Sequence, residues 1–385
     1  MPHPASTWLT LRAGLRDLLL EEHHRPYTIF KSFLSLDNQT PQMITFIGER
    51  TKSLVMQKLR FGARPYESIS GQVHLRVDEE TAKQGSPLLL ADCELHNLSF
   101  LTKAETEGYM GDIVQRPLTW HKRLSQGLDP ASLAHLIYAK LIAPFSNVIC
   151  FFAEDLGGMQ AVAGVLAVWL MSFSNRPSDL PFSTRPRVLI LTRCSDPTTF
   201  DEQSATKRFM MDLGRESERK NGMIAGQDNG KLKKAQLDEI LSQQFGGMRV
   251  VGYPDLDPGD SGARAWRSLR TRILKDSNEL QDRRRDSLVA FSARHFKAFF
   301  HLACDHFCTD IVSPFGFIRA SRLQNPVPQD LSLHMARFIK QVKPSQLLNF
   351  AVPMIASALM FDSYVSEMHG EDAKSPPKLI ILTLK

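Results

Sequence analysis

Short apolar runs bounded by turn residues recur along residues 40–260. Met43 to Ile47 form such a run and predict a buried strand, which ends at Gly48 and is followed by a segment that predicts a helix over 54–59. Strands that alternate with helices are typical of an α/β fold with a mainly parallel sheet. We expect the later strands at residues 73–77, 88–91, 148–152, 187–192 and 248–253.

Helical periodicity governs the two ends of the chain. Leucines between residues 9 and 20 predict a polar-amphipathic helix that ends at Pro26, and a second short helix is expected over 27–36. From Ala263 onward strands disappear until the extreme end, and apolar positions three and four residues apart predict helices. The expected helices, including those between strands, lie at 130–142, 159–173, 234–245, 264–285, 292–311, 331–342 and 344–361.

The stretch from Gln42 to Ser53 has the layout of a phosphate-binding loop: strand, glycine turn, Lys-Ser, helix. In such a loop the N–H groups and the helix N-terminus hold phosphate, the lysine neutralises it and the hydroxyl meets Mg²⁺. The full pattern is G-x-x-x-x-G-K-[ST], whereas this chain lacks the second glycine and is two residues short. The spacing predicts a damaged phosphate site at Gly48, Thr51, Lys52 and Ser53. The alternative is an ordinary βα turn with a solvated lysine.

An aspartate follows the apolar strand expected at 88–91. Asp92, at the carboxyl end of a strand downstream of a P-loop, fits the Walker-B arrangement, which lies beside the P-loop strand and serves Mg²⁺. Ser53 and Asp92 are therefore the candidate Mg²⁺ residues, and we expect the ion only if nucleotide binds. In GTPases this aspartate opens D-x-x-G, but Leu95 stands in place of the glycine. The alternative is that Asp92 and Glu94 are strand-end carboxylates that cap a loop.

Composition and charge indicate the cellular compartment and the kind of partner to expect. The five cysteines are odd in number and scattered, which fits a reducing compartment better than a disulfide framework, so we expect a cytoplasmic protein without a signal peptide. The net charge of +6 is mild at this length. Acidic residues intersperse the basic stretch around Arg283–Arg285, which indicates a solvated helix face, and we expect no nucleic-acid partner.

Residues 156–174 carry no charge and have about the minimum length of a transmembrane helix. Their flanks fit a βαβ unit better, because a strand at 148–152 and a turn precede them and a strand at 187–192 follows. We therefore expect a buried crossover helix. Membrane association through 156–174 is the alternative, and it predicts that the protein pellets with membranes and resists a carbonate wash.

Histidines and cysteines cluster in the helix expected at 292–311. A zinc site would use His301, Cys304, His306 and Cys308. Cys304 and Cys308 share the phenylalanine-rich face, however, and buried free cysteine behaves as a small hydrophobe. Core packing of these side chains is the preferred interpretation.

A likeness to a known family is carried by residues 44–53, 73–75, 90–94, 148–158 and 292–325. In these residues the sequence resembles the upstream, GTPase-like P-loop region of fungal multidomain proteins that carry a patatin-like phospholipase domain further on. The resemblance implies nucleotide-binding roles for Gly48, Lys52 and Ser53 and a Walker-B role for Asp92. It also implies switch-like roles for Ser68, Ser70 and Glu94. The chain contains no G-x-S-x-G, so we expect no phospholipase chemistry in it, and at most a weak P-loop NTPase.

Two functional hypotheses follow. The first is a degenerate GTPase-like module that binds GTP or ATP and regulates a patatin-like lipid hydrolase, in cis or in trans. The second is a non-catalytic interaction scaffold that has lost nucleotide binding. The apolar run at 378–384 leads us to expect a truncated chain, or a last strand that joins a missing neighbour. The expected organisation is a helical N-terminal segment (1–40), a P-loop NTPase-like α/β domain (41–262), a helical region (263–365) and a tail (366–385).

Overall fold

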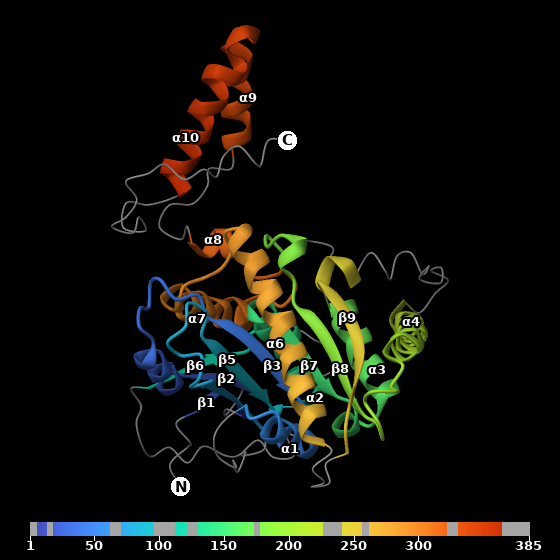
Figure 1. Cartoon of the computed structure of the whole chain (residues 1–385). Helices are drawn as coiled ribbons and strands as arrows, with labels where there is room; N and C mark the ends of the chain where they lie inside the picture. The colour runs from blue at the N-terminus through green and yellow to red at the C-terminus, as the bar shows by residue number, and fades with distance from the viewer. Residues whose placement is uncertain are drawn as a thin grey trace. The chain divides into compact units, whose positions relative to one another are not determined.

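The computed structural model describes residues 6–13, 18–61, 71–95, 112–121, 130–172, 178–225, 241–255, 262–321 and 330–363. The chain divides into two compact units, residues 1–315 and 316–385 (Figure 1). The strands of the first unit are β1 (Thr7–Ala13), β2 (Leu18–His23), β3 (Gln42–Ile47), β4 (Gln72–Val77), β5 (Leu88–Cys93), β6 (Ile113–Pro117), β7 (Val148–Phe152), β8 (Arg187–Arg193) and β9 (Gly247–Tyr253). Its helices are α1 (Arg50–Lys58), α2 (Pro130–Leu136), α3 (Met159–Ser172), α4 (Glu202–Ala225), α6 (Gly262–Asp286) and α7 (Ala293–Thr309).

The described strands form one mixed sheet in the order β6-β2-β1-β4-β5-β3-β7-β8-β9. The pairs β3–β5, β3–β7, β7–β8 and β8–β9 are parallel. The pairs β1–β2, β1–β4, β2–β6 and β4–β5 are antiparallel. The α/β class is therefore confirmed, but "mainly parallel" holds only for the half of the sheet that contains β3.

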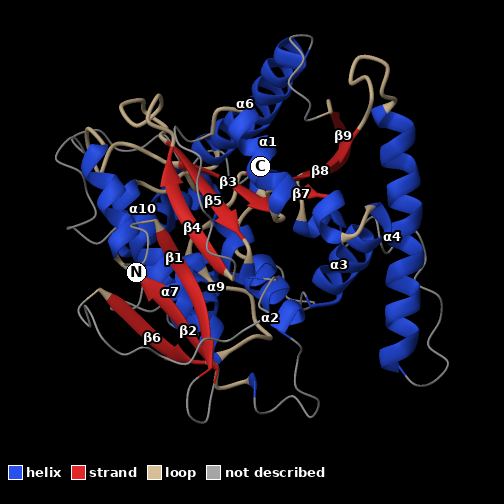
Figure 2. Cartoon of the chain, turned by 90° about the horizontal axis from the view of Figure 1, so that it is seen from below, coloured by secondary structure: helices blue, strands red, loops and turns tan. Residues whose placement is uncertain are grey.

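Helices cover both faces of the parallel half, which explains why consecutive residues in the middle of its strands are apolar and buried. Phe151 of β7 contacts Trp169 of α3, with ring centroids 5.2 Å apart. Its neighbour Phe152 points the other way, into a core cluster that includes Trp266 and Ile273 of α6. Figures 1 and 2 show α1 and α6 on one face and α3 on the other, with α4 packed against α3. The expected βαβ unit, β7–α3–β8, is confirmed.

The first helix expected in the N-terminal segment, which was to end at Pro26, is wrong. The segment forms β1 and β2, and a 3-10 helix at Arg25–Ser32 lies near the expected second helix. Trp8 and Leu9 are adjacent and both fully buried; Trp8 stacks on Phe300 of α7, and β2 and β4 flank β1 within the sheet. A strand buried on both faces loses the alternation that distinguishes it from a helix.

The helices expected at 130–142, 159–173, 264–285 and 292–311 are confirmed, the first as α2 followed by a π-helical turn at Ile137–Ile142. The long helix α4 was not expected. Helices α6 and α7 belong to the same compact unit as the sheet, so the expected boundary at residue 262 falls inside that unit. Of the helix expected at 234–245, only residues 241–245 are described.

The second unit contains α8 (Phe317–Ser321), α9 (Leu331–Gln341) and α10 (Val352–Ser363). A ring contact between Phe338 and Phe350, 6.4 Å between centroids, joins α9 to the short helical segment before α10. The tail over 366–385 and its strand-like run lie outside the described residues. Across both units, none of the described helices is long and apolar enough to cross a membrane.

Candidate functional site

The expected strand-loop-helix layout is present. Strand β3 lies between β5 and β7, and the chain turns at Gly48 into α1, whose first residue is Arg50. The carboxyl ends of parallel strands meet at one edge of a sheet, so residues that follow β3, β5, β7 and β8 converge here. The loop from Gly48 to Lys52 therefore lies where ligands bind in many α/β proteins.

The N-terminus of α1 already holds an anion, and the chain itself supplies it. The carboxylate of Asp155 accepts backbone hydrogen bonds from Glu49 (2.7 Å), Thr51 (2.9 Å) and Lys52 (2.8 Å). A negative group at this position satisfies N–H groups that the helix leaves without partners and faces the positive end of the helix dipole. Asp155 thus occupies the position that phosphate takes at a P-loop.

Gly48 permits this close approach. A β-carbon at residue 48 would lie 2.7 Å from the Oδ2 atom of Asp155 and 3.0 Å from the β-carbon of Phe152. Any side chain would force the carboxylate or the strand end to move. The glycine predicted to cradle phosphate therefore admits the Asp155 carboxylate in this structure.

The side chain of Lys52 forms ion pairs with two other carboxylates, those of Asp92 and Glu94. Its ammonium group is fully buried, forms an ion pair with Asp92 and lies 2.8 Å from Glu94 Oε1. Burial lowers the pKa of Lys52, but the negative charges of Asp92 and Glu94 outweigh burial and raise it. Burial likewise raises the pKa of Asp92, while Lys52 reverses this effect and lowers it. The buried Lys52–Asp92 pair is therefore charged at neutral pH.

The remaining predicted residues have local roles in the structure. Ser53 Oγ donates to the carbonyl of Glu49 at 3.0 Å, within the first turn of α1. Strand β5 lies directly beside β3, as expected for Walker B, and Asp92 also faces Arg76 at 3.5 Å. Leu95, the departure from D-x-x-G, is fully buried. Ser68 and Ser70 lie outside the described residues.

The turn that carries Asp155 is anchored by the preceding residue. Glu154 accepts hydrogen bonds from Thr192 Oγ1 (3.1 Å), from the backbone N–H of Arg193 (2.6 Å) and from Tyr253 OH (2.9 Å). Gly157 then reverses the chain with φ of +89°. Sequence reasoning found this turn but assigned no role to its acids. The signal was available: two adjacent acids follow a buried strand one residue after its end.

The alternative zinc cluster does not assemble. Cys304 and Cys308 are buried on the core face of α7, and burial raises the pKa of both thiols. The Nε2 atom of His306 lies 3.0 Å from the carbonyl of Ser313, while His301 faces Glu22. The core interpretation of the two cysteines is confirmed.

Comparisons with known proteins give weak likenesses only. No known protein family and no curated protein matches the chain. Among solved structures, it is similar to the mammalian SRP receptor (14% identity, TM-score 0.31, 61% of this chain and 99% of that chain covered). It is also similar to the signal recognition particle receptor SRb-GTP/SRX complex from Chaetomium thermophilum (13% identity, TM-score 0.29, 60% and 99% covered). A third likeness is to the siderophore hydrolase EstA from Aspergillus nidulans (10% identity, TM-score 0.25, 71% and 97% covered). Likenesses at these TM-scores carry no argument about function.

Proposed function

We propose that this chain is a GTPase-like binding module that works without nucleotide, as a non-catalytic interaction scaffold. One observation carries the proposal: the Asp155 carboxylate accepts three N–H bonds of 2.7–2.9 Å at the start of α1, where a P-loop would hold phosphate. The chain thereby supplies its own anion.

Electrostatics favours this self-occupied state. A phosphate placed about 4 Å from the Asp155 carboxylate would meet a repulsion of about 4 kcal/mol per unit charge at the effective dielectric of a protein surface. The side chain of Lys52, which would attract β- and γ-phosphate, is already neutralised by Asp92 and Glu94. Nucleotide binding would therefore require the loop N–H groups to leave Asp155, and Lys52 to leave Asp92 and Glu94, for the phosphates.

One observation favours the first hypothesis, nucleotide binding, as a second candidate. The N–H groups of Glu49, Thr51 and Lys52 already converge on an anion, so phosphate would find formed donors if Asp155 withdrew. GTP or ATP would then bind through Gly48 to Ser53, with Mg²⁺ at Ser53 and Asp92. In either case a patatin-like hydrolase, in cis or in trans, is the partner that the sequence resemblance suggests.

Equilibrium binding of fluorescent GTP and ATP analogues, with and without Mg²⁺, separates the two candidates. We expect no saturable binding by the wild type. Asp196 provides a matched control, since its carboxylate also accepts a backbone N–H, from Thr198 at 2.8 Å, in a turn after the neighbouring strand β8. Asp155→Ala should gain affinity for triphosphate and Asp196→Ala should not. Saturable wild-type binding that Lys52→Ala weakens would refute the scaffold proposal and establish nucleotide binding.

A further inference from the structure

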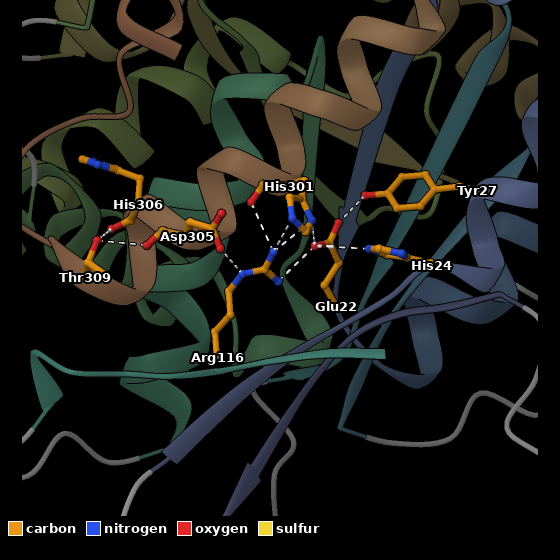
Figure 3. A network of polar contacts seen from close by, with 8 residues as sticks. All are labelled: Glu22, His24, Tyr27, Arg116, His301, Asp305, His306 and Thr309. Atoms are coloured by element: carbon orange, nitrogen blue, oxygen red, sulfur yellow. Dashed lines mark hydrogen bonds and ion pairs between the residues drawn. The ribbon is translucent and has the colours of Figure 1, made fainter. Parts of the chain in front are cut away.

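A second cluster of polar side chains lies at the antiparallel half of the sheet. Glu22 is the penultimate residue of strand β2, His24 directly follows the strand and His301 lies on α7 (Figure 3). One oxygen or nitrogen atom from each lies within 4.8 Å of the other two. Among the described residues, no other group of three histidine, cysteine or acidic side chains comes this close together.

His301 Nδ1 lies between a carboxylate and a guanidinium. His301 Nδ1 lies 2.8 Å from Glu22 Oε2 and 2.9 Å from a guanidinium nitrogen of Arg116. One ring nitrogen cannot donate a proton to the carboxylate and accept one from arginine at the same time. A protonated Nδ1 donates to Glu22, whereas an unprotonated Nδ1 and the carboxylate oxygen are two acceptor atoms that face each other, as metal ligands do. In this structure Arg116 supplies the positive charge between them.

We propose that Glu22, His24 and His301 form a binding site for a divalent transition-metal ion of the zinc class. Two imidazoles and one carboxylate are a ligand set that zinc takes in proteins, with water in the fourth position. Ligand atoms around tetrahedral zinc lie about 3.3 Å apart, from bonds of about 2.0 Å. The distances from Glu22 Oε2 to His301 Nδ1 and to His24 Nε2, 2.8 and 3.9 Å, lie on either side of that value.

Outer contacts orient the carboxylate as metal ligands require. Tyr27 OH donates to Glu22 Oε1 at 2.8 Å, and Trp8 Nε1 donates to Tyr27 OH at 3.0 Å. These bonds leave Oε2 facing the two histidines. The side chains of His24 and His301 are 31% and 38% exposed, whereas Glu22 is fully buried. The Nε2 atom of His24 is itself buried and has no hydrogen-bond partner, so it is available as a ligand.

Arg116 is the competitor for the site. Its guanidinium lies 3.0 Å from Glu22 Oε2 and contacts the ring of His301, while its Nε pairs with the half-exposed Asp305. A metal ion that enters between the ligands must displace the guanidinium from them, and Asp305 can retain it. Removing the arginine charge should therefore strengthen metal binding. His306, on the same helix, points away from the cluster in Figure 3 and belongs to a different contact.

Titration of the full chain with Zn²⁺, followed by calorimetry and by the thermal melt, tests the site. We expect one equivalent to bind and to raise the melting temperature. His24→Gln and His301→Gln should each weaken binding at least tenfold, and Tyr27→Phe, which removes an outer contact, about tenfold. Arg116→Gln should strengthen it. His334→Gln, at an exposed histidine of the second unit, is the matched control and should change nothing.

Three results would overturn the proposal. The first is a wild type that does not bind Zn²⁺ saturably. The second is binding that survives both histidine variants, each shown folded by its metal-free melt. The third is binding lost in Cys194→Ser, which would assign the zinc to the half-buried thiol instead.

Discussion

Replacing Asp155 with alanine should destabilise the fold through the N-terminus of α1. The change removes the acceptor of three backbone hydrogen bonds and a negative charge at a helix N-terminus. Hydrogen bonds to a charged group contribute about 1.5–3 kcal/mol each, and the loss of a cap costs about 0.5–2 kcal/mol. Asp155 is only half-buried, so water will satisfy part of the freed N–H groups. We expect a loss of about 2–4 kcal/mol in the free energy of unfolding.

Urea unfolding of the wild type, Asp155→Ala and the Asp196→Ala control measures this loss. The control should change by less than about 1 kcal/mol, because its carboxylate lies in an exposed turn. Inorganic phosphate or sulfate should then stabilise Asp155→Ala more than the wild type, since only the variant has a free anion position. A variant as stable as the wild type, or equal stabilisation of both proteins by phosphate, would refute the assignment of Asp155 as the resident anion.

Further predictions concern buried charges and thiols. Lys52→Met should destabilise the fold by about 3–5 kcal/mol in urea unfolding, because it leaves two carboxylates buried without their cation. The folded-state pKa of Asp92 is lowered, so the Lys52–Asp92 pair stabilises the fold fully above about pH 4, and this stabilisation is lost as the pH falls through that pKa. In Asp92→Asn, the free energy of unfolding should therefore fall less steeply as the pH is lowered. Arg284 is buried among backbone carbonyls, and burial lowers its pKa to about 10; Arg284→Met should cost about 3 kcal/mol by the same assay, and a loss below about 1 kcal/mol would contradict the packing. Cys194 is half-buried, whereas the other four cysteines are buried, so a thiol reagent should label one site in the native protein and none in Cys194→Ser. Partial burial raises the pKa of Cys194 to about 11, so the labelling rate should rise about tenfold per pH unit up to pH 11.

The local sequence was sufficient to predict the strands and helices around the candidate site. An apolar run, a glycine and a Lys-Ser pair are contiguous, so β3, the loop and α1 could be placed, and strand spacing gave β7, α3 and β8. The first two strands could not be placed in this way. β1 and β2 are leucine-rich, and their strand conformation depends on pairing with β4 and β6, which follow much later in the chain.

The partners of the site residues were beyond the sequence for the same reason. Asp155 lies 103 residues after Lys52, and His301 lies 279 residues after Glu22. Motif spacing describes the loop but not the group that fills it. The roles predicted for Ser53 and Asp92 in Mg²⁺ binding, the switch-like roles and the patatin-like partner stay predictions.

The contacts that hold Glu154 and Asp155 in place bear on how the binding activity of the protein could be regulated. A free nucleotide binds in proportion to its concentration, and it can be exchanged or hydrolysed. Asp155 is covalently tethered to the loop it fills, so its effective concentration is fixed by the fold and no dilution removes it. If the scaffold proposal is correct, the carboxyl edge of the sheet acquires its binding shape when the chain folds, without a nucleotide. Such a surface would be regulated by the amount of protein and by its binding partners, rather than by nucleotide exchange and hydrolysis.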